Sequence, residues 1–168
     1  MTIHKGLSII DSTILAAHIA YTYGPMSHLK LQKLLYLIEG YHLAYFDGAS
    51  VIKDEFQAWV HGPVSRKIYD ELKDKSILYG DIKYELEEGE EEPIERLRRE
   101  LASEQIELIE EVLSLYKGES GIALEGITHK QQPWINARKG YGPADKCEEI
   151  INRDDMKNYF SNLINTKA

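Results

Sequence analysis

The sequence has little of several features that define common classes of protein. It contains one cysteine, Cys147, among 168 residues. A disulfide within the chain is therefore impossible, and a reducing cytoplasm is the expected compartment. The apolar stretch at residues 7–19 is broken by Asp11 and His18, has no signal-peptide pattern, and no later stretch reaches the roughly 20 apolar residues of a membrane span. We therefore expect a cytoplasmic protein with no membrane partner.

The chain also has few marks of catalysis. Its six histidines form neither an H-E-x-x-H pair nor a site with a C-x-x-C motif, and no glycine-rich phosphate loop or G-x-S-x-G elbow is present. No motif surrounds Cys147, which favours a structural thiol over a nucleophile. We accordingly expect no metal, no cofactor and no enzymatic activity.

Positive charge is in short supply as well. The formal net charge is −8 and the isoelectric point is near 5.3, which argues against nucleic acid as a direct partner. Six of the eight residues from Glu85 to Glu92 are glutamate, and Arg96, Arg98 and Arg99 follow them. One interpretation is a solvated loop whose charge the arginines balance; the other is an acidic bait for a basic partner.

What the sequence does have is helical periodicity. Residues 9–23 are expected to form a helix with Ile10, Ile14, Ala17 and Tyr21 on its buried face. Ser27 is a suitable N-cap for a second helix that runs to about residue 45. The inward side chains of this second helix are expected to be Leu31, Leu34, Leu35, Ile38, Tyr41 and Tyr45, and the outward ones Lys30, Lys33 and Glu39.

The rest of the chain predicts short elements without a linker long enough to divide it, so residues 1–168 are expected to form a single domain. Strands are expected at residues 56–60 and 82–86. Helices are expected at residues 64–75 (started by Pro63), 94–116 (divided at Ser103), 120–127, 133–140, and from 154 onward. Met156, Phe160 and Leu163 are the expected inward residues of the last helix.

Two motifs each bring a histidine close to a tryptophan and a proline. They are Trp59-Val60-His61-Gly62-Pro63-Val64 and Thr128-His129 followed by Pro133-Trp134. In one interpretation the rings fill the core and the imidazoles satisfy backbone groups. In the other the two motifs meet in a polar and aromatic pocket. Trp59, His61, His129 and Trp134 are therefore the candidate partner-binding residues.

These motifs belong to a longer pattern that resembles a known family. The pattern comprises Leu29-Lys30-Leu31-Gln32-Lys33-Leu34-Leu35-Tyr36, Trp59 with Gly62-Pro63-Val64 and Tyr69, Thr128-His129, Pro133-Trp134 with Ala137-Arg138, and Lys157-Asn158-Tyr159-Phe160. In this order it is similar to the Panacea antitoxin domain, also called SocA-like, with a core at about residues 26–160. The resemblance implies an α-rich α+β fold, a compact helical domain with a small antiparallel β element.

The resemblance also implies a function in bacterial or prophage toxin–antitoxin pairs. The leading hypothesis is an antitoxin that neutralises a cognate small toxin by direct binding. The alternative is an adaptor that delivers its partner to a protease, or a phage-encoded modulator of a host protein. A small enzyme that uses His61 and His129 is the third hypothesis. The chain shows no helix-turn-helix domain beside the core, so the resemblance does not extend to control of its own transcription.

Overall fold

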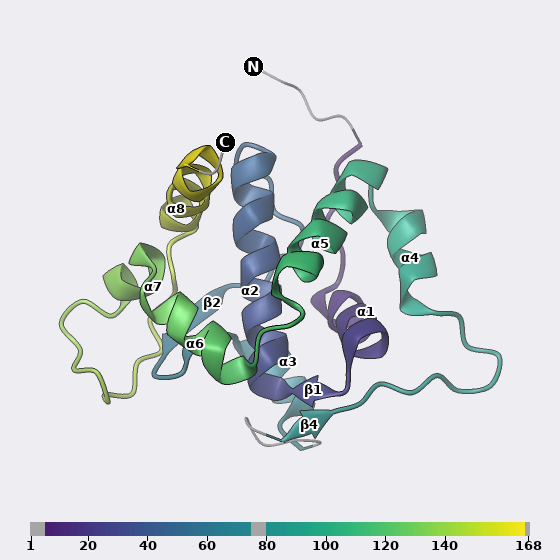
Figure 1. Ribbon diagram of the computed structural model, residues 1–168, viewed down its shortest axis with the longest axis horizontal. Helices are drawn as coiled ribbons and strands as arrows, with labels where there is room; N and C mark the ends of the chain where they lie inside the picture. The colour runs from purple at the N-terminus through teal and green to yellow at the C-terminus, as the bar shows by residue number, and fades with distance from the viewer. Residues whose placement is uncertain (1–5, 75–79, 167–168) are drawn as a thin grey trace.

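Helix α2 (His28–Tyr45) runs through the middle of the molecule, and the other helices surround it (Figure 1). The structure is a computed structural model that describes residues 6–74 and 80–166. The remaining helices in these residues are α1 (Ser12–Tyr23), α3 (Arg66–Leu72), α4 (Pro93–Glu100), α5 (Ser103–Tyr116), α6 (Gly121–His129), α7 (Gln132–Ala137) and α8 (Arg153–Thr166). None of the helices in the described residues is long and apolar enough to cross a membrane.

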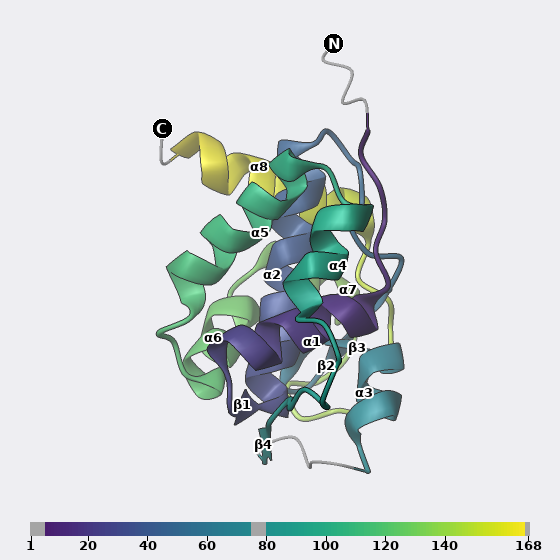
Figure 2. The same ribbon diagram turned by 90° about the vertical axis from the view of Figure 1, so that its right-hand side faces the viewer.

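Fifteen of the eighteen residues of α2 are buried because α1, α5, α6 and α8 cover it on different sides. Figure 2, turned by 90°, shows α8 crossing one end of α2, α5 running obliquely beside it, and α1 crossing nearer its other end. Gly40 permits the closest of these approaches: a Cβ added there would lie 2.2 Å from the ring of Phe160. The core therefore forms around one helix, with the sheets at its edge.

The burial of α2 overturns part of the sequence prediction. Lys33 and Glu39 were expected to face outward, yet both are fully buried. Each finds backbone partners there: Lys33 Nζ donates to Pro63 O at 2.8 Å, and Glu39 Oε1 accepts from Val51 N at 2.9 Å. Tyr45, expected inward, is 60% exposed at the end of the helix.

Helix α1 forms where the sequence predicts it, but a different face is buried. Asp11 caps it by accepting from Thr13 N at 2.8 Å. The buried residues of the helix are Ser12, Leu15, Ala16, His18, Ile19 and Ala20. Tyr21, which was expected to be buried, is exposed. The apolar residues of α1 are spread around the helix, so periodicity alone did not identify the side that packs.

The β structure in residues 6–74 and 80–166 consists of two antiparallel strand pairs, which confirms the α-rich α+β class. Strand β1 (Met26–Ser27) pairs with β4 (Asp81–Ile82), and β2 (Phe56–Trp59) pairs with β3 (Gly62–Ser65). The sequence predicted neither β1 nor β3, and it predicted β4 as the longer segment 82–86.

Strand β3 replaces the start of the predicted helix 64–75. Pro63 lies in the strand opposite Ala58 instead of opening the helix. The true N-cap of α3 is Ser65, whose hydroxyl accepts from Ile68 N at 3.2 Å. Lys75, the expected last residue of that helix, lies outside the described residues.

The later helices begin and end close to their predicted positions. The break at Ser103 separates α4 from α5, with Ala102 as the N-cap. On α5, Ile109 and Leu113 are buried, while Ile106 and Tyr116 are partly buried. Met156 and Phe160 of α8 are buried, as predicted.

Candidate functional site

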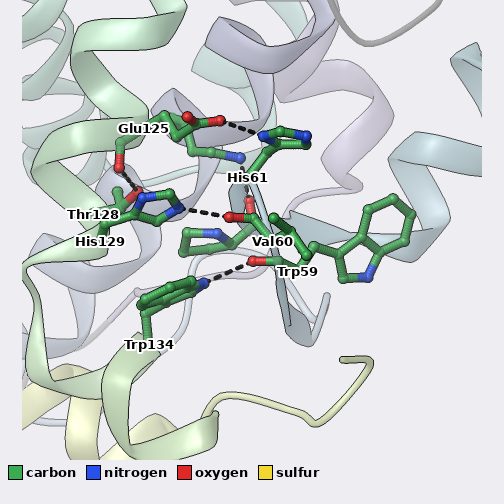
Figure 3. A network of polar contacts seen from close by, with 9 residues as sticks. Trp59, Val60, His61, Glu125, Thr128, His129 and Trp134 are labelled. Carbon is green, nitrogen blue, oxygen red and sulfur yellow. Dashed lines mark hydrogen bonds and ion pairs between the residues drawn. The ribbon is translucent and has the colours of Figure 1, made fainter. Parts of the chain in front are cut away.

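The two motifs that pair a histidine with a tryptophan meet in space, although 64 or more residues separate them (Figure 3). The first motif forms the end of β2, its turn and the start of β3. The second lies at the end of α6 and the start of α7. His129 Nε2 donates to Val60 O at 2.7 Å, and Trp134 Nε1 donates to Trp59 O at 2.9 Å. The second motif thus binds the backbone of the first.

Two further side chains bind the same hairpin in the same way. Arg138 Nη1 donates to Ala58 O at 2.9 Å, and Lys33 Nζ donates to Pro63 O. Lys33, His129, Trp134 and Arg138, here called the hairpin clamp, therefore supply donors to four carbonyls of one short hairpin. Buried carbonyls cost free energy when they lack a donor. The clamp satisfies these groups and fixes the hairpin against α2, α6 and α7.

The turn of the hairpin is shaped around Lys33. Gly62 has a φ of +100°, and a Cβ at this position would lie 2.6 Å from Lys33 Cε and 2.8 Å from Thr128 Oγ1. Glycine alone adopts this conformation without strain and leaves room for the lysine stem. Thr128 Oγ1 donates to Glu125 O at 3.0 Å, which holds its hydroxyl on α6.

Charges beside the turn are arranged around the buried lysine. Burial lowers the pKa of Lys33 to about 7, while the nearby carboxylate of Glu125 opposes this shift. Glu125 Oε1 lies 2.8 Å from His61 Nδ1. Burial also lowers the pKa of His129, which favours a neutral imidazole whose Nε2–H binds the carbonyl. The site therefore combines a buried weak cation with a more exposed carboxylate–imidazole pair.

The side chain of Trp59 turns away from this network toward the surface (Figure 3). The guanidinium of Arg66 lies 5.1 Å from the centroid of its ring, and the ring of Tyr69 meets it edge-on at 4.8 Å. A surface cavity of about 540 Å³ is bordered by Trp59, His61, Arg66, Tyr69, Lys146, Cys147 and Glu148, and Arg66 Nη2 donates to Glu148 Oε1 at 2.6 Å. We call it the aromatic pocket.

The four candidate residues thus divide into two pairs. Trp59 and His61 border the aromatic pocket, whereas His129 and Trp134 stack on each other at 4.3 Å and hold the hairpin from behind. Sequence reasoning missed the contributions of Lys33, Arg66 and Glu125. A signal for Lys33 existed: it lies in a helix with leucines on every side, where a lysine without an exposed face needs a buried acceptor.

No group of three or more histidine, cysteine, aspartate or glutamate side chains in residues 6–74 and 80–166 is arranged to hold a metal ion. The residues that meet at the hairpin instead offer hydrogen-bond donors, a partly exposed indole and a guanidinium. This chemistry suits recognition of another molecule's surface.

Comparison with protein-family models matches residues 31–135 to the family described as "Antitoxin SocA-like, Panacea domain". This stretch contains α2 from Leu31 onward, both strands of the hairpin, and three of the four clamp residues. No curated protein and no solved structure gives a significant match.

Proposed function

The chain belongs to the SocA-like Panacea antitoxin family, and from that premise we propose that it neutralises a small protein toxin by binding it directly. The observation that carries the proposal is the family match across residues 31–135. The matched stretch includes the hairpin and most of its clamp, which position the aromatic pocket. A binding protein of this kind needs a rigid recognition surface and no reacting group.

The composition of the aromatic pocket supports this role. Tryptophan, tyrosine and arginine are the residues most enriched among those that dominate protein–protein binding energy. Trp59, Tyr69 and Arg66 contact one another here at a partly exposed surface. We propose that Trp59 and His61 contact the toxin, while His129 and Trp134 contribute by holding the hairpin that carries them.

The overall charge also suits the proposed partner. A net charge of −8 attracts a basic protein over a distance and raises its association rate. Toxins that act on nucleic acids need basic surfaces to do so. An acidic antitoxin can therefore approach and cover such a surface.

A co-expression experiment tests the function. Each small gene adjacent to this one is expressed alone and then together with the chain in a bacterial host. One neighbour is expected to stop growth alone and to lose that effect with the chain, and the two proteins are expected to co-purify in a fixed ratio. Neighbours that are all harmless when expressed alone would contradict the proposal.

The same cells distinguish direct neutralisation from delivery to a protease. Direct binding predicts that the toxin persists at an unchanged level when growth recovers. A toxin that disappears on co-expression, and persists only in a protease-deficient host, would indicate the adaptor alternative.

The proposed contact residues are tested by alanine substitution in the purified pair. Trp59→Ala is expected to weaken toxin binding by about 30-fold or more, because truncating a tryptophan hot spot costs upwards of about 2 kcal/mol. The matched control is Tyr141→Ala, an exposed aromatic on a loop outside the aromatic pocket. Equal affinities for both variants would remove Trp59 from the interface.

A further inference from the structure

A groove of about 400 Å³ lies between α1, α3, β4 and the segment that leads into α4. One wall is the side of α1 that carries Ala16, Ala17 and Ala20. Ile14 and Leu72 contribute further, partly exposed apolar surface, and Leu31, Ile68 and Ile82 lie buried beneath it. Because alanine side chains are short, another chain can approach the backbone of α1 closely. Water in contact with such a surface is displaced favourably by apolar side chains.

The rim of the groove is acidic. Glu71 lies on α3, and Glu90, Glu91 and Glu92 lie on the segment before α4. Arg96 also borders the groove and pairs with Glu100 of its own helix. Four carboxylates therefore surround an apolar interior, and their field disfavours nucleic acids and acidic peptides alike.

Neutral donors hold two of these carboxylates in place. Tyr21 Oη donates to Glu92 Oε1 at 3.2 Å, and Tyr84 Oη donates to Glu90 Oε1 at 2.9 Å. The two tyrosine rings meet edge-on at 6.3 Å. A phenol that donates to a carboxylate positions it without cancelling its charge. Glu91 differs, because Arg99 neutralises it through an ion pair.

We propose that this groove binds an amphipathic segment of the toxin in which apolar side chains are flanked by lysine or arginine. The proposal rests on the proposed function and states which kind of toxin segment the groove binds. The apolar interior takes the apolar anchors, as in other helix-in-groove interactions. The acidic rim then selects basic flanks, which are the features that a toxin acting on nucleic acid carries at its working surface.

The groove and the aromatic pocket lie on two sides of α3. Ile68 and Leu72 of this helix border the groove, whereas Arg66 and Tyr69 border the aromatic pocket. One toxin that straddles α3 can contact both.

A peptide probe tests the chemistry of the groove without the toxin. The probe is a synthetic helix-forming peptide of about 14 residues, made of leucine and lysine with leucine at i, i+3, i+4 and i+7. Added to the ¹⁵N-labelled full chain, it is expected to shift the amide resonances of Ala17, Ala20 and Ile82. A peptide of leucine and glutamate with the same spacing is expected to leave them unchanged. Absence of binding, or shifts confined to another surface, would overturn the proposal.

Matched charge variants test the rim. Glu90→Gln, Glu91→Gln and Glu92→Gln together remove three of its four carboxylate charges and keep oxygen acceptors. The control replaces Glu85, Glu87 and Glu88 by glutamine, which removes the same charge from the same run outside the groove. The rim variant is expected to bind the leucine–lysine peptide about tenfold more weakly, since each exposed ion pair contributes up to about 1 kcal/mol. An equal loss in both variants would mean that total charge, and not the groove, selects the peptide.

The affinity of a toxin for the rim variant and for the control variant separates this inference from the proposed function. If a toxin binds the wild-type chain and the rim variant binds it about tenfold more weakly than the control variant does, both proposals are supported. If the toxin binds both variants equally, the toxin does not use the groove and only the present inference fails. If no neighbouring gene encodes a toxin, the proposed function fails, and the peptide experiments still decide whether the groove recognises basic amphipathic segments.

Discussion

Two ionisable side chains on α2 are buried with opposite charges and different partners. Lys33 faces the hairpin, while Glu39 accepts from the backbone of Val51 and lies 3.5 Å from Arg153 Nε. Burial of a charge costs free energy unless partners replace the lost water. Here most of the partners are backbone groups, which supply dipoles but no full charge. Burial therefore favours the uncharged form of each side chain: it lowers the pKa of Lys33 and raises the pKa of Glu39.

The first prediction concerns the pH dependence that Glu39 contributes. Burial raises the pKa of Glu39 from 4.5 to about 7, against the opposing effect of Val51 N. The folded state then binds more protons than the unfolded state between these values, so the free energy of unfolding falls as pH rises from 4.5 to 7. The size of this contribution is about 3 kcal/mol. Glu39→Gln, which keeps an acceptor, is expected to match wild type near pH 4.5 and to exceed it in urea unfolding above pH 7.

Glu110 provides the control with the opposite sign. Hydrogen bonds from His18 and Tyr23 hold the pKa of Glu110 below its usual value. As the pH rises toward the usual glutamate pKa of 4.5, the free energy of unfolding of Glu110→Gln is therefore expected to fall relative to that of wild type. The same direction of change in both variants would contradict the assignment of Glu39 as a group that is neutral when folded.

The second prediction at this scale concerns Gly62. Gly62→Ala adds a Cβ within 2.6 Å of Lys33 Cε in a conformation with φ of +100°. Gly140 is the matched control, because its φ is +92° and no atom lies within 4 Å of its Cβ position. Gly140→Ala is expected to cost about 1 kcal/mol, the strain of a positive φ alone. Gly62→Ala is expected to cost about 3 kcal/mol or more in chemical unfolding, because Lys33 must also move. Equal costs would mean that the lysine stem does not fix the turn.

At the scale of elements, the β2–β3 hairpin depends on donors from other helices. Trp134→Phe removes the bond to Trp59 O and keeps a ring for His129 to stack on. We expect a loss of about 1 kcal/mol and faster hydrogen exchange at the amides of β2 and β3. The control is Trp59→Phe. It removes an indole N–H that donates to Gln57 within the same strand and, among the described residues, binds no other element. Exchange that rises equally in both variants would show that the clamp does not hold the hairpin.

The elements that could be predicted from the sequence are those with local signals. Helices α2, α5 and α8 have apolar repeats, α2 also has the Ser27 cap, and all three begin within a few residues of their predicted starts. Strand β3 could not be predicted, because Gly-Pro before a polar run reads as a helix start. The segment forms a strand because the distant hairpin clamp, through Lys33, binds Pro63 O. The buried face of α1 was likewise decided by contacts with α2 and α4, which no local pattern contains.

The candidate site was predictable to a similar degree. The sequence identified both tryptophan motifs, and the structure brings them together. It did not distinguish the pair that faces the surface from the pair that faces the hairpin backbone. That distinction depends on how α6 and α7, which carry His129 and Trp134, pack against the hairpin, and no local pattern contains this packing. Arg66 entered no motif because its role comes from α3 lying beside Trp59.

At the scale of the whole molecule, the buried helix α2 anchors a rigid frame for surfaces carried by short elements. Groups from α1, α5, α6 and α8 pack on α2, so displacement of any one exposes the same core. The hairpin and α3 lie at the edge of this frame and carry the aromatic pocket and one side of the groove. Such a division leaves the recognition surface free to vary in sequence while the frame remains unchanged.

The net charge of −8 leads to the last prediction, on the kinetics of toxin binding. Charges outside the contact surface act over roughly 10 Å at 0.1 M salt and affect the encounter more than the lifetime of a complex. Raising NaCl from about 0.05 M to about 0.5 M is therefore expected to lower the association rate constant by about tenfold or more. The dissociation rate constant, measured in the same surface-binding experiment, is expected to change by less than about threefold. A dissociation rate that rises as much as the association rate falls would instead mean that the glutamates act mainly through direct ion pairs with the toxin.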